Sequence, residues 1–299
     1  MRTLKSMSVE RGYGSTMGSI IFAGQGHIGV HCLRVLQKGF RAISIMNGQD
    51  KQILELRRDS DEVIDNFHDS DSKYVFMAGW TPLITIEELD AKTFINIHGS
   101  LLPKYRGTHS IFWAIMNFEN ELGYTIHEVN RNIDDGDIIY QYRFRHENQT
   151  IGEIHKLFHD DLSKNLVNVL SKYMSNEIVA RPQDKRLATW CPKRNLTDCV
   201  VDFTWPNAII DRFFLALTPP YPLPRIIIRS IMYEVLEFRL LPADYFCDVG
   251  RVVNIDEEGV WIKTKEGLMI VSRVRNTENQ IVADPRKLLK VGYRFKHNM

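Results

Sequence analysis

Cysteine, long hydrophobic runs and an excess of either charge are all scarce in this 299-residue chain. Its four cysteines show no Cys-x-x-Cys spacing, so the sequence suggests neither a zinc site nor a disulfide framework. No apolar run approaches the roughly 18 residues that a membrane-spanning helix needs. A net charge of +1 argues against a broadly basic surface for nucleic acid, although a local patch stays open. We therefore expect a reduced, cytoplasmic protein with no membrane, metal or nucleic-acid partner.

The beginning of the chain is polar and contains no hydrophobic segment of the signal-peptide type. We expect residues 1–17 to form a flexible extension, and the choice of Met1, Met7 or Met17 as the translation start stays open. With 44% hydrophobic and 25% charged residues, the chain can build one sizeable core and a smaller second one.

Beyond this extension, apolar segments alternate with helical patterns. Strands are expected at 19–23, 40–46 and 74–78, with a helix that ends at Lys38 and another over 51–67. This alternation is typical of an α/β fold with a mostly parallel sheet.

A longer amphipathic pattern covers residues 151–174 and predicts a packing helix. Its two histidines, His155 and His159, are expected to be solvated rather than functional.

The turn after the first strand, Gly24-Gln-Gly26-His-Ile-Gly29, fits the dinucleotide-binding fingerprint, and Asp50 lies 21 residues past Gly29. Taken alone, these features would indicate a nicotinamide enzyme. The fingerprint is weak in isolation, because any tight strand-to-helix turn in such a fold uses glycine. We keep a dinucleotide site as a minor alternative.

The most informative stretch is residues 94–107, which read Phe-Ile-Asn-Ile-His-Gly-Ser-Leu-Leu-Pro-Lys-Tyr-Arg-Gly. Asn96 and His98 stand two positions apart at the end of an expected buried strand, so their side chains should point the same way. An isolated Asn-x-His is more simply a turn cap and a hydrogen-bonded core histidine. A second strand is expected at 124–129, followed by an acidic loop that ends at Gly136. This loop can bring a carboxylate to the imidazole, which favours a catalytic role for Asn96 and His98 over a structural one.

Together these segments resemble the folate-dependent formyltransferases. That family carries an Asn-x-His with a Ser-Leu-Leu-Pro continuation, then a Thr-x-His strand and an Asp-x-Gly loop, and all of them occur here in order within roughly residues 76–141. The resemblance implies catalytic roles for Asn96, His98 and Asp134, with 10-formyltetrahydrofolate as co-substrate and no metal.

The chemistry of such a triad can be argued from the residue types. A neutral amine attacks the formyl carbon, and negative charge develops on one oxygen. Asn96 can donate to that oxygen, and a lost donor of this kind costs roughly 2.7–4 kcal/mol of transition-state stabilisation. His98 can move protons near neutral pH, and Asp134 would orient its ring and favour the protonated form.

The resemblance also implies binding residues. The run 77–84 is similar to the family's pterin loop, although any single Trp is equally well explained as ordinary core. The implied folate contacts are Gly79, Trp80, Leu83, Ile84, Leu102 and Asp134. The implied acceptor contacts, each also open to a surface or packing role, are Gln25, Gly26, Lys104, Tyr105, Arg106 and Tyr221.

The periodicity is interrupted around 181–198, and short alternating strands follow. We expect a Rossmann-like catalytic domain at 18–184 and, with a linker, a C-terminal antiparallel β domain at 185–299. The latter loosely resembles the barrel-like domain of methionyl-tRNA and sugar formyltransferases.

The acceptor is expected to be a nucleotide-linked amino sugar, dTDP-4-amino-4,6-dideoxyglucose for O-antigen, a surface polysaccharide. Methionyl-tRNA formyltransferases carry a basic loop where this chain has only the short interval before residue 74, so a tRNA acceptor is a weaker alternative. A non-catalytic module that binds a nucleotide sugar is the third interpretation of the function. Whether the chain forms a homodimer stays open.

Overall fold

The computed structural model describes residues 17–48 and 50–295, so almost all of the predicted extension lies outside the described residues. Contacts divide the chain into two compact units. The first comprises residues 1–98, 126–140 and 159–183, and the second 99–125, 141–158 and 184–299. The predicted domain boundary at 184/185 stays a prediction.

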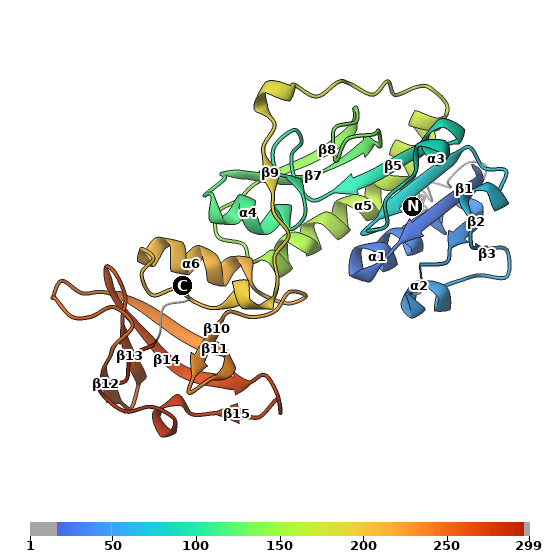
Figure 1. Cartoon of the computed structure of the whole chain (residues 1–299). Coiled ribbons are helices and arrows are strands. Elements are labelled where there is room, and N and C mark those ends of the chain that lie inside the picture. The colour runs from blue at the N-terminus through green and yellow to red at the C-terminus, as the bar shows by residue number, and fades with distance from the viewer. Residues whose placement is uncertain (1–16, 49, 296–299) are drawn as a thin grey trace, which may run out of the picture. The chain divides into compact units, whose positions relative to one another are not determined.

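The larger sheet has seven strands in the order β3-β2-β1-β4-β5-β7-β8 (Figure 1). The pairs among β1 to β5 are parallel, as expected from the alternating pattern. The order reverses between β1 and β4, and in such sheets ligands bind outside the carboxyl ends of the strands near this point. The strands are β1 (Met17–Gly24), β2 (Phe40–Met46), β3 (Glu62–Ile64), β4 (Tyr74–Ala78), β5 (Thr93–His98), β7 (Glu121–Glu128) and β8 (Ile138–Arg145).

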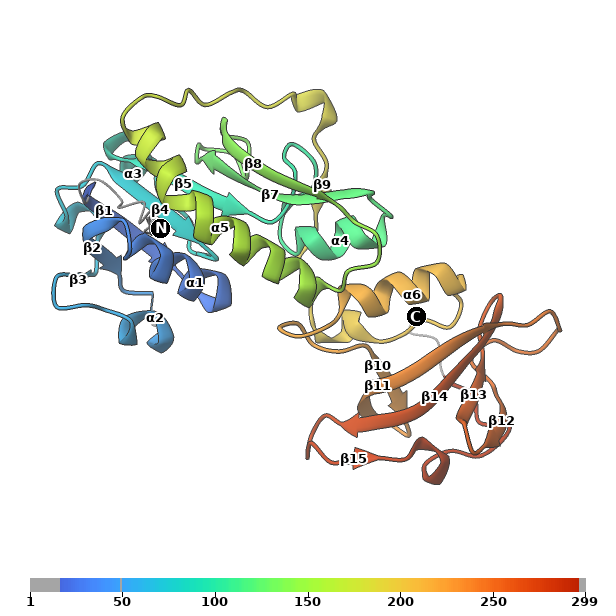
Figure 2. The same ribbon diagram turned by 180° about the vertical axis from the view of Figure 1, so that it is seen from behind.

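The central strand β1 is buried on both faces, because Ile20, Ile21 and Phe22 are all fully buried. A continuous apolar run of this kind is what a parallel strand covered by helices requires. Figure 2 shows α1 (Gly26–Leu36) and the C-terminal part of α5 (Ile151–Met174) side by side in the first unit. None of the helices in the described part of the chain is long and apolar enough to cross a membrane.

The predicted helix over 51–67 is wrong. Only α2 (Lys51–Glu55) is helical, and the chain then forms a turn, β3 at the sheet edge and a 3₁₀ helix at Phe67–Asp69. The buried carboxylate of Asp61 accepts hydrogen bonds from the Arg58 side chain and from the Ile43 amide. These bonds tie the turn to β2 and end the helix.

The remaining helices are short. Helix α3 (Ile86–Ala91) begins at Thr85, whose hydroxyl accepts from the Glu88 amide while the Glu88 carboxylate accepts from the Thr85 amide. This reciprocal capping satisfies two donors that the helix cannot satisfy itself. The second unit contains α4 (Ser110–Met116) and α6 (Asn207–Ala216).

The C-terminal sheet is antiparallel, which confirms the predicted β domain. Its order is β10-β11-β14-β13-β12, and β15 also pairs with β14. A separate parallel pair, β6 (Arg106–Gly107) with β9 (Trp190–Cys191), was not predicted. The strands of the C-terminal sheet are β10 (Arg225–Ile228), β11 (Ile231–Pro242), β12 (Val252–Asp256), β13 (Gly259–Lys263), β14 (Gly267–Asn276) and β15 (Val282–Ala283). Further 3₁₀ turns lie at Lys185–Leu187, Leu196–Cys199 and Pro285–Lys287.

Candidate active site

Asn96 and His98 lie on the same face of β5, at the carboxyl end of the strand. Asn96 pairs in register with Met77 of the neighbouring β4 and is half-buried, whereas His98 is buried. These two polar side chains lie at the edge of the sheet where such folds bind their ligands.

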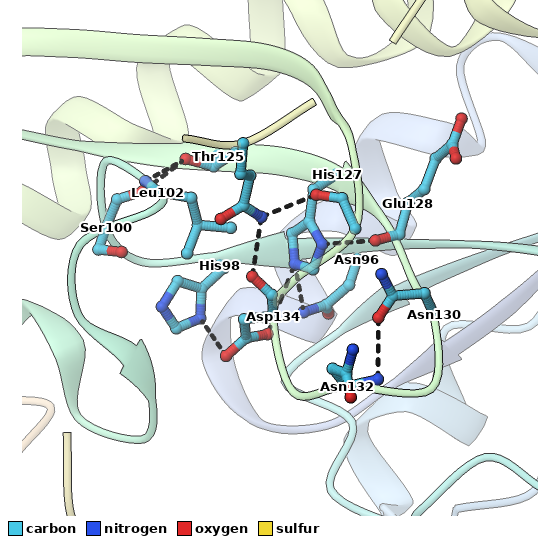
Figure 3. Close-up of polar contacts among 12 residues, drawn as sticks. Asn96, His98, Ser100, Leu102, Thr125, His127, Glu128, Asn130, Asn132 and Asp134 are labelled. Carbon is cyan, nitrogen blue, oxygen red and sulfur yellow. Dashed lines mark hydrogen bonds and ion pairs between the residues drawn. The ribbon is translucent and has the colours of Figure 1, made fainter. Parts of the chain in front are cut away.

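The Asp134 carboxylate lies between two imidazoles of the first unit (Figure 3). Its Oδ2 is 3.4 Å from His98 Nδ1 and its Oδ1 is 3.5 Å from His127 Nε2. The structure therefore brings together the three predicted catalytic residues and adds a second histidine.

His127 is the site residue that sequence analysis missed. It is 1% exposed, and its Nδ1 lies 2.6 Å from the Glu128 carbonyl oxygen. A carbonyl only accepts, so His127 Nδ1 carries a hydrogen. His127 Nε2 faces both Asn96 Nδ2 at 3.3 Å and Asp134 Oδ1 at 3.5 Å, and when the ring is neutral, Nε2 accepts from the Asn96 amide. The sequence signal that could have identified His127 is the Thr125-x-His127 spacing, which places both side chains on one face of β7.

The loop that carries Asp134 is folded tightly against β7. A Cβ atom at Gly136 would lie 1.9 Å from the Glu128 carbonyl oxygen, so only glycine fits there. The Glu128 amide in turn donates to the Asp137 carbonyl at 2.9 Å. The same carbonyl that orients His127 is thus the one that Gly136 approaches.

The segment that follows β5 belongs to the second unit, where Thr125 holds it. The fully buried Thr125 hydroxyl donates to the Ser100 carbonyl at 2.6 Å and accepts from the Leu102 amide at 3.1 Å. Gln141 Nε2 donates to Thr125 Oγ1 at 3.0 Å and to the Leu102 carbonyl at 2.8 Å. The backbone of Leu102, a predicted folate contact, is therefore fixed within this unit.

The glycine-rich turn is closed by an acidic side chain. Asp50 Oδ2 accepts from the Gly26 amide at 2.8 Å, and its Oδ1 accepts from the Gln52 amide. Gln25 Nε2 donates to the Gly48 carbonyl at 3.3 Å. A carboxylate at the first amide of α1 occupies the place that a pyrophosphate would take, which weakens the dinucleotide alternative.

The predicted pterin-loop residues have diverse environments. Gly79 has a φ of 70° and approaches the Gln25 carbonyl too closely for a side chain. The Trp80 ring packs edge-on against Phe67, with its indole nitrogen buried and without a hydrogen-bond partner among the described residues. Leu83 is 89% exposed, and Ile84 packs against the same apolar cluster as Trp80.

Two of the predicted acceptor residues meet one carboxylate in the second unit. Glu119 Oε1 accepts from Lys104 Nζ and from the Tyr105 hydroxyl, both at 2.8 Å. Burial, together with the hydrogen bond to Glu119 and its charge, raises the pKa of Tyr105. All three residues line a cavity of about 240 Å³.

The other two predicted acceptor residues of this unit lie in packed surroundings. The Arg106 side chain is buried, with its guanidinium 5.9 Å from the centre of the Trp190 ring. Tyr221 stacks on His155 with ring centroids 5.7 Å apart, and burial raises the pKa of its hydroxyl.

Comparison with known proteins identifies the family. The formyl transferase family model matches residues 37–170, and the model of the formyl transferase C-terminal domain matches residues 195–288. The methionyl-tRNA formyltransferase of Fervidobacterium nodosum is 31% identical over 221 residues, which covers 70% of this chain and 69% of that protein.

Two solved structures share the fold. WlaRD, a sugar 3N-formyl transferase crystallised with dTDP and 5-N-formyl-THF, has a TM-score of 0.63 at 22% identity, covering 89% of this chain and 100% of WlaRD. HypX from Aquifex aeolicus in complex with tetrahydrofolic acid also has a TM-score of 0.63, at 17% identity. It aligns with 90% of this chain, which spans about half of HypX (46%). With both domain models matched in order and the triad assembled, this chain belongs to the formyl transferase family.

Proposed function

We propose that this chain transfers a formyl group from 10-formyltetrahydrofolate to the amino group of a nucleotide-linked amino sugar. The observation that carries the proposal is the cluster of Asn96, His98, His127 and Asp134 at the carboxyl end of β5. It combines a fixed amide donor with a carboxylate-oriented imidazole, and formyl transfer to an amine needs both.

The reaction replaces one carbon–nitrogen bond by another. The acceptor nitrogen forms a bond to the formyl carbon and loses a proton, while the bond from that carbon to folate N10 breaks and N10 gains a proton. Asn96 has two amide hydrogens; one is directed to His127, and the second can stabilise the developing oxyanion. The Asp134 carboxylate, 3.4 Å from His98 Nδ1, favours a hydrogen on that nitrogen. The neutral ring then has its lone pair on Nε2, which can take the proton from the amine.

Several features of the first unit suit a folate. Gly79 offers exposed backbone with no side chain, and Leu83 presents an exposed apolar surface. The buried indole nitrogen of Trp80 is a donor that the described residues leave unsatisfied, and a buried donor of this kind favours a ligand acceptor. We propose that these residues, with Ile84 and Asp134, hold the folate, and Leu102 of the second unit stays a predicted folate contact.

The sugar acceptor is supported by WlaRD, which aligns over its whole length with this chain. It is also supported by the short segment between α2 and β4. The Arg58–Asp61 turn, β3 and a 3₁₀ helix form this segment, which lacks the basic loop expected of methionyl-tRNA formyltransferases. We propose dTDP-4-amino-4,6-dideoxyglucose as acceptor, with a cytoplasmic role in O-antigen synthesis. Methionyl-tRNA is the second candidate, because the relative from Fervidobacterium nodosum is named for that activity.

The test is incubation with 10-formyltetrahydrofolate and, separately, dTDP-, UDP- and GDP-linked amino sugars or Met-tRNA, with products identified by mass spectrometry. Formylation of a sugar supports the proposal, whereas formylation of Met-tRNA alone would replace it. His98→Ala and Asp134→Asn should lose turnover while their unfolding temperatures stay close to wild type. His68→Ala, at an exposed histidine outside the cluster, is the matched control and should keep full activity.

A further inference from the structure

A buried glutamine side chain is bonded to the loop that carries Asp134. Gln183 is 7% exposed, and its Nε2 donates to the Asp134 carbonyl at 2.8 Å and to the Gly136 carbonyl at 2.7 Å. Both hydrogens of one planar amide are thus directed at two carbonyls of the same loop. All three residues belong to the first unit.

The segment around Gln183 is itself fixed beside this loop. The Arg181 amide donates to the Ile138 carbonyl at 2.9 Å, and the Ile138 amide donates to the Arg181 carbonyl at 2.7 Å. Ile138 begins β8, immediately after the loop. Gln183 therefore reaches the loop from a backbone that is paired with the sheet.

Asp134 needs such support because of its backbone conformation. Its φ is 51°, in the left-handed region that residues with a Cβ seldom adopt. A conformation of this kind persists only where the surroundings determine it. Here it aims the carboxylate between His98 and His127.

We propose that Gln183 is a positioning residue for formyl transfer: it fixes the Asp134 backbone so that the carboxylate orients the His98 ring. The inference rests on the proposed function of the Asn96, His98 and Asp134 cluster. Gln183 acts through the loop and touches neither substrate nor the reacting atoms.

The first test measures the His98 ring without any substrate. In ¹⁵N-labelled protein above neutral pH, the wild type should show His98 as a single tautomer with hydrogen on Nδ1. Gln183→Leu removes both donors and should give mixed tautomers for His98. Asp184→Asn is the control, because among the described residues the Asp184 carboxylate accepts only from Arg186. It should leave the ring signals unchanged.

The second test uses steady-state kinetics. Misplacing a catalytic group by about 1 Å can lower the rate by about 100-fold, so Gln183→Leu should reduce kcat by roughly 10- to 100-fold with a small change in KM. Gln183→Glu keeps the shape but presents a carboxylate to two carbonyls. Its activity should partly recover as the pH falls and the introduced carboxyl group regains a donor hydrogen, and Gln183→Leu should show no such recovery.

Identical His98 ring signals in wild type and Gln183→Leu would overturn the inference, as would an equal disturbance in Asp184→Asn. If Gln183→Leu does not fold, Gln183→Glu carries the test, and a pH profile parallel to wild type would refute the proposal. Wild-type protein that formylates no acceptor would count against the proposed function, while the ring spectra would still decide the role of Gln183.

Discussion

Replacing Thr125 by valine should destabilise the second unit by removing the hydroxyl that holds the segment after β5. The change preserves the shape of the side chain but leaves the Leu102 amide and the Ser100 carbonyl without the partner that the structure gives them. A buried group left unsatisfied costs roughly 1–3 kcal/mol. The free energy of unfolding should therefore fall by about 2–6 kcal/mol, with the upper end reached only if water cannot enter.

Thr125→Ser separates the hydroxyl from the methyl group. It keeps the three hydrogen bonds and loses one buried methyl, which costs about 0.8 kcal/mol in transfer free energy. Urea unfolding should rank wild type above Thr125→Ser and both well above Thr125→Val. Equal losses in the two variants would show that packing, not the hydroxyl, fixes this segment and would refute the reasoning.

Two further outcomes are expected. Gly136→Ala should lower kcat by up to about 100-fold, because the new Cβ displaces the Glu128 carbonyl that orients His127; unchanged kinetics would contradict this. Burial, followed by the neighbouring His31, lowers the pKa of His159 from 6.5 to about 4. The unfolded chain takes up this proton near pH 6.5 and the folded chain only near pH 4, so thermal stability should fall as the pH drops through this interval. His159→Gln should flatten that dependence, and a slope as steep as in wild type would count against it.

The parts of the site that could be predicted rest on short-range patterns. The two-residue period of a strand placed Asn96 and His98 on one face, and the structure has both at the end of β5. The acidic loop between two strands predicted a carboxylate near the imidazole, and the resemblance to the folate-dependent formyltransferases implied that this carboxylate is Asp134. Its carboxylate lies within 3.4 Å of His98, as expected.

His127 and Gln183 were not identified because their roles depend on contacts between distant segments. His127 is defined by bonds to Asn96, on another strand, and to the carbonyl of Glu128. Gln183 is defined by a loop 47 and 49 positions earlier in the chain. In a single sequence, the Thr125-x-His127 spacing indicates only that two side chains share a strand face, and a glutamine after a helix has no local mark of such contacts.

Two errors have local physical causes. The apolar residues of 51–67 were assigned to one helix, although the Arg58–Asp61 turn, held by the buried Asp61 carboxylate, separates them into a helix and an edge strand. His155 was expected to be solvated, but it is 8% exposed and stacks on Tyr221. It follows Ile154 and precedes Phe158 by three positions, so the helical period itself places it on the buried face.

The glycine-rich turn bears on where a nucleotide acceptor can bind. An α-helix N-terminus attracts anions through its unsatisfied amides and its dipole, but here the Asp50 carboxylate already accepts from the Gly26 amide. A diphosphate brought to this turn would meet that negative charge and would have to displace it. If the acceptor carries a diphosphate, the sugar and its amine can approach Gln25, while the phosphates are expected to bind cations elsewhere. The glycine-rich turn fits the dinucleotide fingerprint, but we expect no phosphate to bind there while the Asp50 carboxylate accepts from the Gly26 amide.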